Sequence, residues 1–156
     1  MALPIDNDTQ LINYQDVVQL AGTADELYVR AIEWINTQYN NPADACRIRN
    51  RESAVIEIAH RFEILNDEEG DKLIAGIVNY TLKLEFKPGR YRYTLSDLIL
   101  KKSTRFPIER WLNKEDSMYS PLWDSYLIQV NKQAKALIDS LKAGMEPQVI
   151  KQEEKW

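Results

Sequence analysis

The stretch YTLKLEFKPGRYRYTLSDLILKK, residues 80–102, decides the fold because it predicts a β-hairpin with one apolar face. Aromatic and leucine side chains alternate with polar ones on both sides of Pro88-Gly89, which is the period of a strand buried on one face. A two-residue loop at Pro88-Gly89 sets the cross-strand pairs Phe86–Tyr91, Leu84–Tyr93, Leu82–Leu95 and Glu85–Arg92. A shift of one residue would expose every aromatic side chain, so this register is well determined.

Two helices are predicted by apolar residues that recur at helical spacing. The first covers residues 24–38 and begins at a capping box formed by Thr23 and Glu26. The second is the longest element of the chain and carries an apolar stripe within residues 120–145. We expect Gly144 to end this second helix, because glycine is common just beyond a helix C-terminus.

The alternating pattern of strands recurs in residues 12–20, 53–65 and 72–78. Asp16 interrupts the first of these segments, which predicts a bulge or an edge position. The third segment runs into the hairpin, and Gly76 marks either a bend in one long strand or a tight turn between two short ones. Residues 42–52 are predicted to be a polar loop, and residues 107–113 one or two helical turns that begin at Pro107.

The order of these elements predicts an α+β fold. Strands with one apolar face need a covering layer on that side, and the two helices supply it. The expected architecture is a two-layer sandwich in which an antiparallel sheet carries both helices on one face and leaves the other face bare. Residues 3–145 are predicted to form this single domain, and residues 146–156 a polar C-terminal tail.

Composition argues against several classes of protein. The 156 residues are 44% hydrophobic and 28% charged, a globular profile long enough for a core without disulfide or metal support. The net charge of -4 argues against a nucleic-acid partner, and no apolar run has the length of a transmembrane helix. Cys46 is the only cysteine, which excludes an internal disulfide and a thiol-based metal cluster. We predict neither a cofactor nor a metal.

Three segments together resemble one bacterial family, namely residues 3–20, 24–34 and 80–97. The residues that carry the resemblance are the Leu3-Pro4-Ile5-Asp6 opening, Leu27-Tyr28, Ala31, Trp34, Tyr80, Arg90-Tyr91-Arg92-Tyr93 and Ile108-Glu109. The family is a domain of unknown function whose fold is similar to that of the TATA-binding protein (TBP). The resemblance implies a TBP-like sandwich with the element order β-α-β(3-4)-α.

The same resemblance implies a location. Members of the family are typically exported proteins of bacteria, periplasmic or otherwise associated with the cell envelope. Their mature chains begin near the Leu3-Pro4 motif, which implies that Met1-Ala2 stand in place of a native leader. No activity is established for the family, and a fold of this kind does not by itself imply DNA binding.

Our first hypothesis for the function is a non-catalytic module of the cell envelope that binds a protein or a small ligand. The long helix lies over an open sheet, and incomplete closure would leave an apolar groove lined by Tyr80, Tyr91, Tyr93, Trp123 and Tyr126. Alternatively, the uncovered sheet face, with Arg90 and Arg92, is the contact surface. A homo-oligomer is also compatible with the sequence.

Two alternatives belong to other classes of protein. A hydrolase-like enzyme would use His60 in a cleft as a general base beside a carboxylate, although a histidine satisfied in the core or at a sheet edge is the simpler interpretation. His60 is the sole catalytic candidate, and the sequence favours a protein that is not an enzyme. Nucleic-acid binding would use basic residues of the open face, but Glu57, Glu63 and Glu85 are predicted to share that face.

Three further features have simple structural interpretations. The acidic turn within residues 66–71 lacks the ligand spacing of a calcium loop and is predicted to be a solvated turn. Glu109 is expected on a helix surface rather than in a cleft. Cys46 lies near several arginines, which favours the thiolate, but no base is tied to it by sequence spacing.

Overall fold

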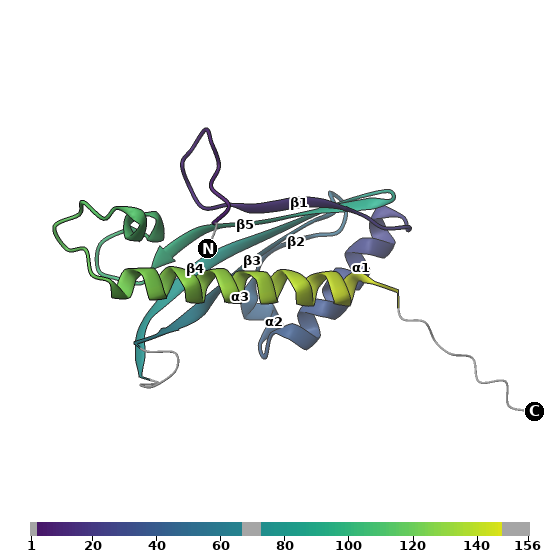
Figure 1. Ribbon diagram of the computed structural model, residues 1–156. Helices are drawn as coiled ribbons and strands as arrows, with labels where there is room; N and C mark the ends of the chain where they lie inside the picture. The colour runs from purple at the N-terminus through teal and green to yellow at the C-terminus, as the bar shows by residue number, and fades with distance from the viewer. Residues whose placement is uncertain (1–2, 67–72, 148–156) are drawn as a thin grey trace, which may run out of the picture.

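The computed structural model describes residues 3–66 and 73–147 and consists of one antiparallel sheet with its long helices on one side (Figure 1). The strand order is β1-β5-β4-β3-β2, and β6 pairs with β5. The strands are β1 (Tyr14–Gln19), β2 (Cys46–Asn50), β3 (Val55–Leu65), β4 (Ile74–Lys87), β5 (Arg90–Leu100) and β6 (Phe106–Pro107). The helices are α1 (Ala24–Gln38), α2 (Pro42–Ala45), the 3-10 helix η1 (Ile108–Leu112) and α3 (Leu122–Met145).

The hairpin of β4 and β5 has the predicted register. Phe86 pairs with Tyr91, Leu84 with Tyr93, Leu82 with Leu95, and Glu85 with Arg92. Lys87 pairs with Arg90, so Pro88 and Gly89 alone form the loop, and Gly89 has the positive φ of 76° that glycine adopts without strain. On the other face, the Arg92 guanidinium donates two hydrogen bonds of 3.0 Å to the Glu85 carboxylate.

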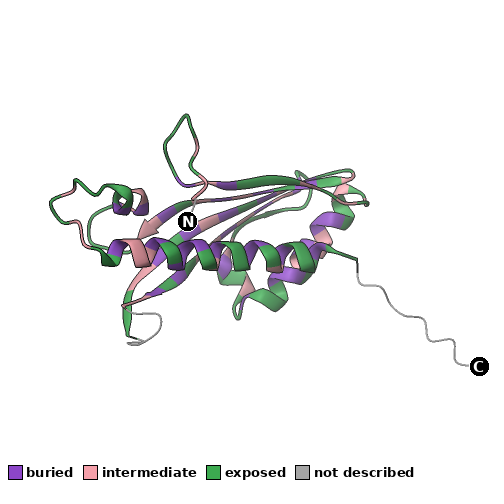
Figure 2. Ribbon diagram, in the orientation of Figure 1, coloured by how far each residue is buried: buried purple, intermediate pink, exposed green. Residues whose placement is uncertain are grey.

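Both long helices cover the face that carries the aromatic side chains (Figure 1). Phe86 meets Tyr28 of α1 edge-on, with ring centroids 5.8 Å apart, and Lys142 of α3 lies over the Tyr93 ring. Buried and exposed residues alternate along α3, the pattern of a helix with one buried side (Figure 2). The opposite face of the sheet carries exposed polar residues such as Lys83 and is covered by neither long helix. The predicted two-layer α+β architecture is confirmed.

The first helix also begins and ends as predicted. α1 covers Ala24–Gln38, and its start is a complete capping box. The Thr23 Oγ1 accepts a hydrogen bond of 3.0 Å from the Glu26 backbone N–H, and the Glu26 carboxylate accepts one of 3.0 Å from the Thr23 N–H. These two bonds satisfy N–H groups that a helix N-terminus otherwise leaves unpaired.

The prediction of a polar loop over residues 42–52 is wrong. This segment contains the short helix α2 and the strand β2, which pairs antiparallel with the first half of β3. β2 is an edge strand, and every residue after Cys46 is exposed, so its sequence shows no alternation of buried and exposed positions. A strand that buries neither face leaves no periodic signal in the sequence.

Gly76 lies inside one long strand, and this decides between the two predicted alternatives. β4 continues from Ile74 to Lys87 without a turn. A Cβ at Gly76 would lie 2.9 Å from Cδ1 of Leu100 on β5, which is closer than carbon atoms normally approach. The glycine therefore permits β4 and β5 to pack closely at this end of the sheet.

Two predictions about the last elements are also wrong. Gly144 does not end α3, which continues to Met145. A Cβ at position 144 would collide with the indole ring of Trp34, so the glycine serves the close approach of α3 to α1. Pro107 precedes η1 as its N-cap residue and also belongs to β6, so it is not the first residue of that helix.

Side chains of α3 protect the free edge of β3. β2 pairs only with the first part of β3, as far as Ile58. Farther along the strand, Gln129 accepts a hydrogen bond of 2.8 Å from the Leu65 N–H and donates one of 2.9 Å to the Leu65 carbonyl, as a neighbouring strand would. Gln133 donates to the Glu63 carbonyl at 2.9 Å. These amides satisfy backbone groups that would otherwise invite pairing with another chain.

Candidate functional site

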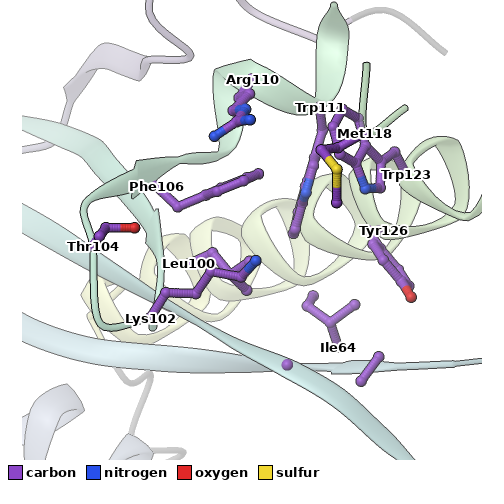
Figure 3. A pocket seen from close by; sticks show the side chains of 12 residues that line it. Ile64, Leu100, Lys102, Thr104, Phe106, Arg110, Trp111, Met118, Trp123 and Tyr126 are labelled. Carbon is purple, nitrogen blue, oxygen red and sulfur yellow. The ribbon is translucent and has the colours of Figure 1, made fainter. Parts of the chain in front are cut away.

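A cavity of about 340 Å³ opens at the end of the sheet where β4, β5, β6, η1 and the start of α3 meet (Figure 3). We call it the aromatic cavity. Its lining residues come from six elements, β3 included, and from the intervening loops: Ile64, Ala75, Gly76, Leu100, Lys102, Thr104, Phe106, Arg110, Trp111, Met118, Trp123 and Tyr126. The volume lies in the range of small-molecule sites, which is roughly 300–1,000 Å³.

The wall of the cavity is a continuous group of four rings. Phe106 lies 6.2 Å from Trp111 and 6.3 Å from Trp123, and Trp111 lies 5.4 Å from Tyr126, all measured between ring centroids. The pairing of Phe106 with Leu100 fixes the start of η1 against β5, and η1 then brings Trp111 to α3. These rings give a ligand a large apolar surface with little loss of side-chain freedom.

Two cations border the cavity. Lys102 Nζ and Arg110 Cζ each lie 4.9 Å from the centroid of the Phe106 ring, and Figure 3 shows them above and below it. Arg110 also donates from Nε to Asp116 at 2.7 Å, and this hydrogen bond lowers the pKa of the Asp116 carboxyl. Asp116 therefore neutralises Arg110, whereas Lys102 has no carboxylate within 4.0 Å among the described residues.

Glu109 lies between the cavity and the N-terminal segment. Its Oε2 accepts a hydrogen bond of 2.8 Å from the backbone N–H of Ile12, and it does not line the cavity. This bond ties the residues before β1 to η1. The two residues of η1 that follow Glu109, namely Arg110 and Trp111, do line the cavity. The carboxylate is therefore structural, since it satisfies a backbone donor and fixes η1 in place.

Only two of the five aromatic residues predicted for a single groove line this cavity, namely Trp123 and Tyr126. Tyr80 is buried and shares a hydrogen bond of 2.7 Å with the hydroxyl of Tyr39, and burial raises its pKa to about 12. Tyr91 is 1% exposed. The five aromatic residues therefore do not share one cavity in the described structure, since Tyr80 lines two other hollows and Tyr91 is buried at the hairpin end of the sheet.

Tyr93, Arg90 and Arg92 lie at the hairpin end of the sheet, far along β5 from the cavity. Tyr93 is buried on the helical face, whereas the two arginines are exposed on the open face. Arg92 is paired with Glu85. Contact of the two arginines with a partner remains a prediction.

His60 is half-buried near the free edge of β3. Its ring packs on Tyr39 with centroids 4.8 Å apart and lies 6.3 Å from the Tyr80 ring. Desolvation, and secondarily the charge of Arg61, lower its pKa, so the neutral imidazole is favoured. Within residues 3–66 and 73–147, no carboxylate lies within 4.0 Å of its ring nitrogens, so the described residues supply no partner for the proposed acid–base pair.

The remaining candidates carry no chemistry in the described residues. Burial raises the pKa of the Cys46 thiol, and the weaker opposing effect of Arg49 does not reverse this, so the expected thiolate is not favoured. In the part of the chain that the structure describes, no group of three or more histidine, cysteine or acidic residues is placed to hold a metal. The acidic segment that we predicted to be a solvated turn rather than a calcium loop falls largely on residues 67–71, which lie outside the described residues.

Sequence reasoning missed most of the cavity. Phe106, Met118 and Lys102 come from loops and a two-residue strand, which have no periodicity that could mark them. Arg110 and Trp111 follow the Ile108-Glu109 pair that contributed to the family resemblance, and this pair was the one sequence signal for the η1 part of the site. The long helix gave Trp123 and Tyr126, because its apolar stripe is readable at helical spacing.

The fold and the site define a class of protein: a two-layer α+β domain with an open sheet, of the TBP-like kind. A family described as "Domain of unknown function (DUF4468) with TBP-like fold" matches residues 14–100. The chain belongs to this family. No curated protein matches the sequence.

Two solved structures have the same fold. A DUF4468 family protein from Bacteroides ovatus ATCC 8483 superposes with a TM-score of 0.72 at 13% identity, covering 96% of this chain and 93% of that one. A TBP-like protein from Parabacteroides distasonis ATCC 8503 superposes with a TM-score of 0.61 at 15% identity, covering 90% of this chain and 97% of that one. At these identities the likeness shows the fold alone. Among the described residues, no helix combines the length and apolar character needed to cross a bilayer.

Proposed function

We propose that this protein is a non-catalytic binding module of the bacterial cell envelope and that the aromatic cavity is its ligand site. The observation that carries the proposal is the open cavity of about 340 Å³ with four rings along its wall. A folded core normally fills such space, since protein interiors are closely packed. The envelope location rests on the family resemblance of the N-terminal and hairpin segments.

The lining of the cavity supports binding rather than catalysis. No histidine, cysteine, aspartate or glutamate is among its described lining residues, so the cavity lacks the imidazole, thiol and carboxylate groups that most often act as general acids or bases. Tyr126 and Thr104 contribute hydroxyl groups that can hydrogen-bond to a ligand. His60 lies outside the cavity and packs against tyrosines.

The ligand that fits this lining is a small molecule with an apolar or aromatic body and one anionic group. The body would pack against the Trp111 and Trp123 rings, and the anion would meet the ammonium of Lys102. Arg110 is engaged with Asp116 and adds less to the attraction. Aromatic or aliphatic carboxylates and sulfonates have this chemistry.

We expect 8-anilinonaphthalene-1-sulfonate, an aromatic sulfonate, to bind the native protein at one site with an increase of its fluorescence. Lys102→Glu should weaken this binding about tenfold, because it replaces an attraction to the sulfonate by a repulsion. Fluorescence titration of the folded protein at moderate salt measures both dissociation constants.

Lys101→Glu is the matched control, because it makes the same change of charge at the exposed neighbouring residue, which does not line the cavity. The dye also binds partly unfolded proteins, so each variant must first show an unchanged melting temperature. Equal loss of affinity in the two variants, or no saturable binding to the native protein, would contradict the proposal.

A further inference from the structure

The open face of the sheet is hollowed near its middle, and Ile99 and Arg105 of this hollow are chain neighbours of Leu100, Thr104 and Phe106 in the aromatic cavity. A cavity of about 570 Å³ lies there, across β3, β4 and β5. Its lining residues are Arg47, Ala59, His60, Arg61, Asn79, Tyr80, Thr81, Asp97, Ile99 and Arg105. None of them lines the aromatic cavity, although both sites lie on the same sheet. We call it the open-face basin.

The sequence explains why this part of the sheet is hollow. Ala59 pairs with Thr81, and Thr81 pairs with Ser96, so three short side chains lie side by side across the open face. Elsewhere on this face, long side chains pair directly, as Glu57 does with Lys83. Alternation along a strand puts all of these residues on the face opposite the helices, so neither long helix packs above them.

Long cationic side chains border the hollow. Arg61 on β3 pairs with Asn79, and Arg105 follows β5 just before β6. Both arginines are exposed, and within the described residues no carboxylate lies within 4.0 Å of either guanidinium. Unpaired guanidinium groups around a concave surface attract oxyanions and can bind them in a two-pronged geometry.

The acidic residues near the basin do not cancel this charge. Glu57 is paired with Arg47, with a distance of 3.3 Å between Nη1 and Oε1. With Arg47 neutralised by Glu57, Asp97 is the one carboxylate among the described lining residues, against the guanidinium groups of Arg61 and Arg105. Thr81 and Asn79 add a hydroxyl and an amide to the floor, and both can donate hydrogen bonds to an anion. The local charge is therefore positive although the whole chain carries -4.

We propose that the open-face basin binds a small, doubly charged oxyanion, that is, a phosphate, a sulfate or the terminal phosphate of a monoester. The ligand accepts hydrogen bonds from Arg61 and Arg105, which approach it from opposite sides of the basin, and from the short polar residues below. The inference is independent of the aromatic cavity, because the two sites share no lining residue.

Calorimetric titration of the folded protein with inorganic phosphate and, separately, with sulfate tests the inference. Saturable binding at one site is expected for the wild type. Arg61→Gln and Arg105→Gln should each weaken the binding about tenfold, since each removes a charge-assisted hydrogen bond. Arg90→Gln is the matched control: it removes the same charge from an exposed position of the same face, and Arg90 does not line the basin.

Unchanged affinity in Arg90→Gln, together with losses in the other two variants, supports the basin as the site. Equal losses in all three variants would overturn the proposal, because they would show a diffuse attraction to the whole face. Absence of saturable binding by either anion would also overturn it. A duplex DNA that binds more tightly than inorganic phosphate, with a steep dependence on salt, would assign the face to nucleic acid instead.

Discussion

Leu84→Ala is expected to lower the free energy of unfolding by about 3–5 kcal/mol, the cost of removing a buried leucine side chain and leaving a cavity behind. Leu84 is 0% exposed and pairs with Ile56 on one side and Tyr93 on the other. It therefore lies at the centre of the face that the helices cover. Urea unfolding monitored by circular dichroism measures the change.

The adjacent Lys83→Ala supplies the control for that prediction. Lys83 belongs to the same strand but faces the open side of the sheet, where it is exposed. Its substitution should change the free energy of unfolding by no more than about 0.5 kcal/mol. Similar costs at positions 83 and 84 would mean that both faces of the sheet are covered, and the two-layer description would fail.

Gly144→Ala is expected to destabilise the protein by about 1–3 kcal/mol, although alanine normally stabilises a helix interior relative to glycine by about 1 kcal/mol. The new methyl group would overlap the Cδ1 and Cγ atoms of the Trp34 indole ring and lie close to the Cβ of Trp34. That ring is held in place, because its Nε1 donates a hydrogen bond of 3.0 Å to Ser140 Oγ. The clash can be relieved only if α1 and α3 move apart.

Ala143→Gly separates this packing effect from helix propensity. Ala143 is the exposed neighbour of Gly144, and glycine there should cost about 1 kcal/mol through propensity alone. Both substitutions are thus expected to lower the melting temperature. Helix propensity alone would predict that Gly144→Ala raises the melting temperature and that Ala143→Gly lowers it. An increase in the melting temperature of Gly144→Ala would show that α1 and α3 do not approach closely at this residue.

The sequence was most informative where one face of an element is buried. The hairpin register followed from the alternation of residues 80–95, and the limits of α1 followed from its capping box and helical stripe. The sequence was silent about β2, whose residues after Cys46 are all exposed. It was misleading about Gly144, since a glycine that ends a helix and a glycine that permits close helix packing look the same in one sequence.

The candidate site was harder to predict because it depends on contacts between distant segments. The stripe of α3 identified Trp123 and Tyr126, but not the space beside them. That space exists because β6 pairs with the end of β5 and so directs η1, with Trp111, toward α3. This arrangement depends on the two residues of β6, and a strand of two residues is too short to recognise by periodicity.

The central claim is that the aromatic cavity receives an anionic aromatic ligand, and the tryptophans test it directly. Trp111 and Trp123 line the cavity, whereas Trp34 is buried beside Gly144 near the opposite end of α3. Protein labelled with 5-fluorotryptophan gives one fluorine signal for each tryptophan, and Trp156→Phe removes the signal of the fourth.

Fluorine NMR during a titration with 8-anilinonaphthalene-1-sulfonate is therefore the decisive measurement. We predict that the signals of Trp111 and Trp123 shift along one saturation curve while the signal of Trp34 stays in place. Saturation of the dye with unchanged Trp111 and Trp123 signals, or with a shift of Trp34 alone, would contradict the claim.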